Sequence, residues 1–157
     1  MVKSIPDGYS TVTPSFTFKD SKKAIEFYKK ALGAKVLDVF PDPTGLGIMH
    51  ATIQIGNSIV MMGDESPGQS CKSAETLGSS PISLFVYVTN ADAAFKQAVD
   101  AGGTATMPVA DMFWGDRAGS IRDPFGYTWM IATHKQDLTQ EQVRKGAEVF
   151  FSQMAQK

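Results

Sequence analysis

One imidazole lies among polar side chains on a face of a predicted strand. In residues 49–55, MHATIQI, apolar side chains alternate with His50, Thr52 and Gln54, so these three share a face. Histidine exchanges a proton near neutral pH, which makes His50 a candidate general base. Because no His-x-His or Glu-x-x-His pair accompanies it, a hydrogen-bonded structural role is the alternative. His134 follows the last predicted strand and is interpreted as structural.

A second group of chemically useful residues lies between two predicted strands. Trp114, Gly115, Asp116 and Arg117 follow each other directly, and Gly115 and Gly119 allow a tight turn. One interpretation is that Asp116 and Arg117 form a local ion pair that shapes the loop. The other is that Arg117 points into a cavity as a cation for a carboxylate, phosphate or phosphonate, with Trp114 as a flat apolar wall.

The strands that position these residues have one apolar and one mixed face. In residues 82–88, Ser83, Phe85 and Tyr87 lie opposite aliphatic side chains, and in residues 11–18 Ser15 lies opposite Phe16. The apolar face must lie under helices, since that removes it from water. The other face suits a half-wet cavity, because Phe85 and Tyr87 would be poorly placed in open water. An ordinary solvated face is the alternative.

The chain contains an internal repeat. The pairs Tyr28/Phe95 and Ala31/Ala98 are both 67 residues apart (95 − 28 and 98 − 31), and a helical pattern follows a strand in each half. Each half is predicted as strand, helix and three strands. We expect one domain over residues 9–135, with repeats at about 9–63 and 82–133 joined by a loop at 64–81.

A third helix is predicted in residues 136–157. The capping pattern Thr139-x-x-Gln142 opens it, and apolar residues follow at helical spacing. The aromatic pair Phe150 and Phe151 on its stripe is expected to serve packing or a subunit contact.

Composition excludes several classes of partner. With 157 residues, 43% hydrophobic content and a net charge of -1, the chain can bury a core but offers no electrostatic footprint for nucleic acid or an anionic membrane. The first residues lack the apolar run of a signal peptide and no stretch is long enough for a membrane span, so a cytoplasmic location is expected. Cys71 lies in a polar loop without a nearby histidine and is interpreted as a plain thiol.

Three motifs in order resemble a known superfamily. VTPSFTFKDSKKAIEFYKKALGAKV, HATIQIGNSIVMMGDE and WGDRAGSIRDPFGYTW are similar to the vicinal-oxygen-chelate superfamily, which contains glyoxalase, bleomycin-resistance proteins and extradiol dioxygenases, and within it to the PhnB-like branch. The resemblance implies an α+β fold with two βαβββ modules. These form a curved eight-stranded mixed sheet with helices on the convex face and a cavity on the concave one, usually in a homodimer.

The resemblance also assigns four positions that hold a divalent metal ion in metal-dependent members. They fall at Thr13, at Met61 or Met62, at Ser83 and at Met130. Hydroxyls and thioethers do not hold such an ion against water, so no metal cofactor is expected. A shifted register could bring in Asp64 or Glu65, which supplies one carboxylate and not a full ligand set.

Two functions from different classes remain, with a weaker third. The first is a small-molecule-binding protein of the glyoxalase/bleomycin-resistance type, a homodimer without the usual metal site. The second is a lyase, isomerase or dioxygenase-type enzyme that uses His50 or an unconventional metal site. The third is a subunit whose cavity has lapsed and whose role is association. The residues predicted to bind the ligand are Thr13, Ser15, Gln54, Met62, Ser83, Phe85, Trp114, Arg117 and Met130.

Overall fold

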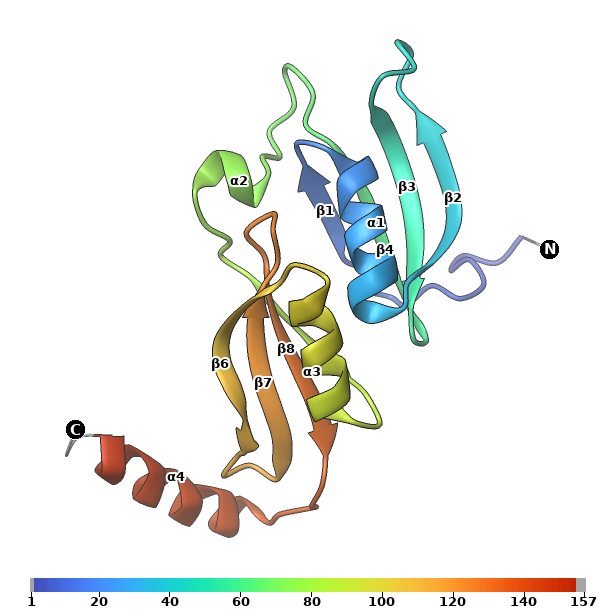
Figure 1. Ribbon diagram of the computed structural model, residues 1–157. Helices are drawn as coiled ribbons and strands as arrows, with labels where there is room; N and C mark the ends of the chain where they lie inside the picture. Colours follow the sequence, from blue (N-terminus) through green and yellow to red (C-terminus); the bar gives the residue numbers. More distant parts are fainter. Residues whose placement is uncertain (1, 155–157) are drawn as a thin grey trace.

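A computed structural model describes residues 2–154, which fold into two modules of the same element order (Figure 1). The first module consists of β1 (Ser15–Phe18), α1 (Ser21–Leu32), β2 (Lys35–Pro41), β3 (Ile48–Ile55) and β4 (Ser58–Asp64). The second consists of β5 (Ser83–Tyr87), α3 (Ala91–Asp100), β6 (Thr104–Asp111), β7 (Asp116–Arg122) and β8 (Thr128–His134). The short α2 (Ala74–Leu77) lies in the connection, and α4 (Gln140–Met154) follows the second module.

Each module contains a four-stranded mixed sheet. The strand orders are β1-β4-β3-β2 and β5-β8-β7-β6, with β1/β4 and β5/β8 parallel and the other neighbours antiparallel. The α+β class and the βαβββ pattern are therefore confirmed. The eight strands form two sheets rather than one continuous sheet, since β1 and β5 are edge strands and are not hydrogen-bonded to each other in residues 2–154.

Both long module helices begin at side-chain caps. Asp20 accepts a hydrogen bond from the Lys23 amide, and Asn90 accepts one from the Ala93 amide. Gly33 ends α1 in the left-handed conformation at φ 64°. The apolar stripe of α1 is buried against its sheet, and α1 also packs against α3. The open face of a sheet is defined below as the face turned away from these helices.

One hydrophobic core joins the modules. Phe16 of β1 lies 4.7 Å from the Tyr127 ring and 6.0 Å from the Trp129 ring, measured between ring centroids. The Tyr127 hydroxyl donates to the Thr17 carbonyl oxygen at 2.8 Å. Buried apolar side chains on the helix side of both sheets belong to one continuous cluster. The relative placement of the modules thus depends on packing across their boundary.

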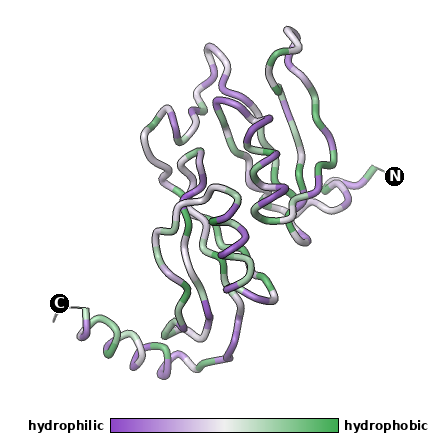
Figure 2. The backbone as a smooth tube through the Cα atoms, in the orientation of Figure 1, coloured by the Kyte–Doolittle hydropathy of each residue, from purple (hydrophilic) through white to green (hydrophobic). Residues whose placement is uncertain are grey.

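Helix α4 follows β8 and extends away from the two sheets (Figure 1). Its capping box is confirmed, because the Thr139 amide donates to Gln142 Oε1 and the Gln142 amide donates to Thr139 Oγ1. No residue of α4 is buried, and Figure 2 shows hydrophobic and hydrophilic positions alternating along its turns. Phe150 and Phe151 contact Phe113, with ring centroids 5.5 and 6.2 Å away. In residues 2–154, no helix combines the length and apolar character needed to cross a membrane.

Candidate functional site

Strand register places a row of aromatic and polar side chains on the open face of the second sheet. Leu84, Val86 and Trp129 pack into the core. Because neighbouring residues of a strand point to opposite faces, Phe85 and its register partner Met130 lie on the open face. The residues that share this face are Ser83, Phe85, Tyr87, Met130, His134, Asp116 and Ser120.

Phe85 and Tyr87 form an exposed aromatic pair. Their ring centroids are 6.4 Å apart with an interplanar angle of 32°, and their exposed fractions are 51% and 61%. Both residues line a cavity of about 370 Å³ between β5 and the first module, which Val12, Pro14 and Ile59 border on the other side. This cavity combines apolar walls with exposed aromatic rings, as binding sites for small molecules do.

A buried carboxylate continues the open face beyond Tyr87. Asp116 is 3% exposed, and its Oδ2 accepts hydrogen bonds from the Tyr87 hydroxyl at 3.1 Å and from Trp114 Nε1 at 2.9 Å. Its Oδ1 lies 2.8 Å from Nδ1 of His134, which is its register partner on β8. The Tyr87 side chain therefore extends across β8 to reach β7. It has room to do so because the residues below it, Ala132 and Ala118, have small, fully buried side chains.

The hydrogen bonds of this cluster set its charges. Burial by itself raises the pKa of Asp116, but hydrogen bonds from His134, Trp114 and Tyr87 outweigh it and hold that pKa below its ordinary value. The Asp116 and Asp137 carboxylates raise the pKa of His134 above 6.5. Burial and the bond to Asp116 raise the pKa of Tyr87. The cluster thus favours the ionised form of Asp116 and the protonated form of His134.

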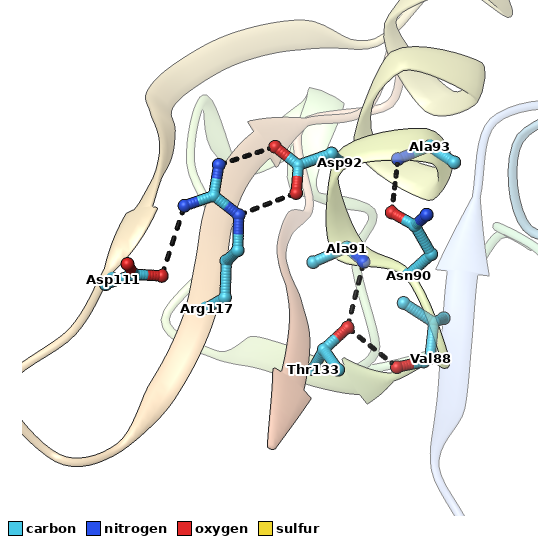
Figure 3. Close-up of polar contacts among 8 residues, drawn as sticks. All are labelled: Val88, Asn90, Ala91, Asp92, Ala93, Asp111, Arg117 and Thr133. Atoms are coloured by element: carbon cyan, nitrogen blue, oxygen red, sulfur yellow. Dashed lines mark hydrogen bonds and ion pairs between the residues drawn. The ribbon is translucent and has the colours of Figure 1, made fainter. Parts of the chain in front are cut away.

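Arg117 and Asp116 are neighbours in β7, so their side chains point to opposite faces of the sheet. Figure 3 shows the Arg117 side chain between Asp92 and Asp111. Its Nε and Nη2 donate to both oxygens of Asp92 in the first turn of α3, at 2.6 and 2.7 Å, and its Nη1 donates to Asp111 at 3.1 Å. Asp92 and then Asp111 raise the pKa of Arg117. The interpretation that Asp116 and Arg117 form a local ion pair is wrong, because β7 begins at Asp116 and its alternation separates the two side chains.

The open face of the first sheet carries the other predicted polar residues. Gln54 is half-buried, and His50 Nε2 lies 3.1 Å from Thr52 Oγ1 and 3.9 Å from Asp38 Oδ1. That Asp38 oxygen is buried and has no hydrogen-bond partner in the described chain. Ser15 is exposed and lies in register with Met61. The structure thus pairs His50 with a carboxylate that the sequence pattern did not identify.

A family model places this arrangement among known proteins. The model of the glyoxalase/bleomycin resistance protein/dioxygenase superfamily matches residues 13–131. The chain belongs to this superfamily. An uncharacterised protein of Mycobacterium bovis is 32% identical over 136 residues, which cover 85% of this chain and 89% of that protein.

Solved structures of superfamily members and related proteins share the fold. A gene product of Arabidopsis thaliana has 25% identity and a TM-score of 0.64, and the match covers 79% of this chain and 98% of that one. The PhnB protein of Bacillus cereus has 15% identity and a TM-score of 0.61, covering 79% and 99%. The family model confirms the predicted superfamily, and this PhnB protein is among the structural neighbours of the chain.

The four positions that the resemblance assigns to metal ligands carry side chains that do not suit a divalent ion. The Thr13 hydroxyl donates to the Ser10 carbonyl oxygen at 3.0 Å, and Met62 is 1% exposed within the core. Met62 is therefore a wrong choice for a ligand contact, and the adjacent Met61 takes the open-face position. Ser83 is exposed and Met130 half-buried on the other open face. A set of hydroxyls and thioethers is a poor ligand set for such an ion.

The structure reveals three site residues that the sequence analysis missed or set aside. Asp38 and Asp116 lie next to the two histidines, and His134 lies in β8 rather than after it. Trp114 stands beside the second open face, where its indole N–H is engaged by Asp116. The strand alternation that put Met130 on the open face also puts His134 there, four residues later.

Proposed function

We propose that this superfamily member is a small-molecule-binding protein that holds its ligand against the aromatic open face of the second module, without a central metal ion. The observation that carries the proposal is the exposed pair Phe85 and Tyr87 on the wall of the cavity. Aromatic rings contribute a large apolar contact area and fix the orientation of a flat ligand. Ser83 and Met130 on the same face would supply further contacts.

We also propose that two copies associate to enclose this site. Strand β2 forms the outer edge of the first sheet, and its apolar side chains are about half exposed, with Leu37 at 49% and Phe40 at 52%. Exposed apolar patches of this kind mark association surfaces. Superfamily members often form dimers, which supports the same expectation.

A neutral aromatic compound tests the binding proposal. Isothermal titration of the purified protein with 2-naphthamide should give saturable binding, and Phe85→Ala should weaken it by about tenfold through loss of the ring contact. Phe151→Ala is the matched control, because Phe151 is similarly exposed (60%) but lies on α4. No saturable binding, or equal weakening by both substitutions, would refute the proposal.

Metal analysis tests the proposal that the ligand is held without a central metal ion. If the purified protein holds a stoichiometric divalent metal ion, and if its removal by chelator abolishes turnover of a vicinal dicarbonyl adduct or a catechol, the protein is a metalloenzyme and the proposal is wrong. Protein that binds 2-naphthamide equally well before and after chelation supports it.

A second candidate function rests on His50. The buried, unpartnered Asp38 oxygen at 3.9 Å could orient and stabilise the imidazolium of a general base that removes a proton from an acidic carbon. Under this alternative, His50→Ala and Asp38→Asn should both lower turnover, by about a hundredfold for the base itself. Unchanged binding and turnover in His50→Ala would assign the residue to structure.

A further inference from the structure

We infer that His134 binds a carboxylate of the small molecule, at the end of the open face next to the aromatic pair. The inference rests on the proposed function and names the chemical class of its ligand: a flat apolar body that carries a carboxylate. In one interpretation of the sequence the cation was Arg117, which instead binds Asp92 and Asp111 on the helix side of the sheet. His134 supplies a cationic donor on the open face.

The His134 imidazole is part of a fixed hydrogen-bond cluster around Asp116. Asp116 is buried, and its oxygens are held by Tyr87, Trp114 and His134 from three separate parts of the second module. Because Nδ1 of His134 is bonded to this fixed carboxylate, Nε2 projects away from Asp116. The His134 side chain is 52% exposed, so a ligand can reach Nε2 from solvent.

A carboxylate already lies at Nε2. Asp137 Oδ1 is 3.1 Å from it, and the Asp137 side chain is fully exposed in the segment after β8. No buried contact holds Asp137 there, and an ion pair between exposed groups contributes little. Asp137 thus shows which ligand chemistry Nε2 accepts, and it can be displaced by a carboxylate that is held by further contacts.

Those further contacts are supplied by the aromatic pair. The Tyr87 hydroxyl and His134 bind the two oxygens of the same Asp116 carboxylate, so the ring of Tyr87 leads from the imidazole to Phe85. A ligand that stacks on these rings can direct a carboxylate toward Nε2. The charged and titratable groups that face His134 are Asp116 from β7, Tyr87 from β5 through Asp116, and Asp137 from its own segment.

Two probes of nearly the same shape, one an anion and the other neutral, separate this inference from the proposed function. By isothermal titration at about pH 6, below the raised pKa of His134, 2-naphthoate should bind the wild-type protein about tenfold more tightly than 2-naphthamide. His134→Gln should reduce this ratio to about one. Asp137→Asn should increase the ratio, since it removes the competing carboxylate, whereas the control Asp100→Asn on the exposed face of α3 should not.

The pH profile distinguishes an ionic contact from a structural role. The preference for the carboxylate should decline as pH rises through the pKa of His134, and Asp116→Asn should move this decline to lower pH, because it removes the main cause of the raised pKa. Equal affinity for the two probes, or a preference that survives in His134→Gln, would overturn the inference. Failure of both probes to bind would instead refute the proposed function.

Discussion

Asp123 is a buried carboxylate whose hydrogen bonds come from both modules. Its Oδ2 accepts from the Tyr28 hydroxyl of α1 at 2.6 Å and from Trp129 Nε1 at 3.1 Å. Its Oδ1 accepts from the backbone amides of Phe125 and Tyr127 in the turn before β8. Burial raises the pKa of Asp123 despite these donors. The turn at residues 123–126 therefore also connects the first module to the second.

Tyr28→Phe should lower the free energy of unfolding by about 1–2 kcal/mol, because it removes one donor from the buried Asp123 carboxylate while Trp129 Nε1 remains. Urea denaturation followed by circular dichroism measures this loss. Tyr9→Phe, in the half-exposed N-terminal segment, is the control and should change stability by less than about 0.5 kcal/mol. Equal stability of Tyr28→Phe and the wild-type protein would contradict the assigned role of this hydrogen bond.

At the scale of single residues, the sequence reveals a side chain's face more readily than its partner. Alternation placed His50 and Phe85 on polar strand faces, and both lie on open faces in the structure. Asp38 could not be paired with His50, because a bulge in β2 between Val36 and Asp38 shifts the register. Asp116 and His134 are neighbours only through the β7/β8 register, which cannot be predicted from one sequence.

At the scale of elements, the start of β7 explains the errors in the Trp-Gly-Asp-Arg stretch. The segment was predicted as a connection, but β7 begins at Asp116, so Asp116 and Arg117 point to opposite faces. Gly119, expected in a turn, lies within β7, where a Cβ atom would come within 3.0 Å of the Phe95 ring. Helices with clear caps, such as α1 and α4, were predictable, whereas the length of a strand depends on its neighbours.

Substitution of Arg117 tests the face of β7 to which its side chain is assigned. Arg117→Gln should cost less than about 1 kcal/mol of unfolding free energy, because its ion pairs with Asp92 and Asp111 are largely exposed. It should leave the affinity for 2-naphthoate unchanged, since the guanidinium lies on the side of the sheet away from Phe85. Thermal unfolding and isothermal titration measure the two effects. A marked loss of affinity for 2-naphthoate would show that Arg117 contributes to ligand binding and would contradict this assignment.

At the scale of the whole molecule, the resemblance to the superfamily predicted the modules but not their separation into two sheets. The repeat at an offset of 67 residues contains the strand and helix of each module, and hydrophobic alternation assigns their inner faces. Whether the edges of β1 and β5 join depends on how the modules pack. Here Phe16, Tyr127 and Trp129 fill their boundary, and a cavity lies beside β5.

A continuous core implies that the modules unfold together. Ile53 in β3 is fully buried in the first module, so Ile53→Ala should cost about 2–5 kcal/mol. Both tryptophans of the chain, Trp114 and Trp129, lie in the second module. In Ile53→Ala, tryptophan fluorescence should therefore show the same lowered urea midpoint as circular dichroism. Met49→Ala, at an exposed position on the same strand, is the control and should leave the urea midpoint unchanged. If the two modules unfolded independently, Ile53→Ala would destabilise the first module alone. Circular dichroism would then show an earlier, partial transition, whereas the urea midpoint of tryptophan fluorescence would stay unchanged.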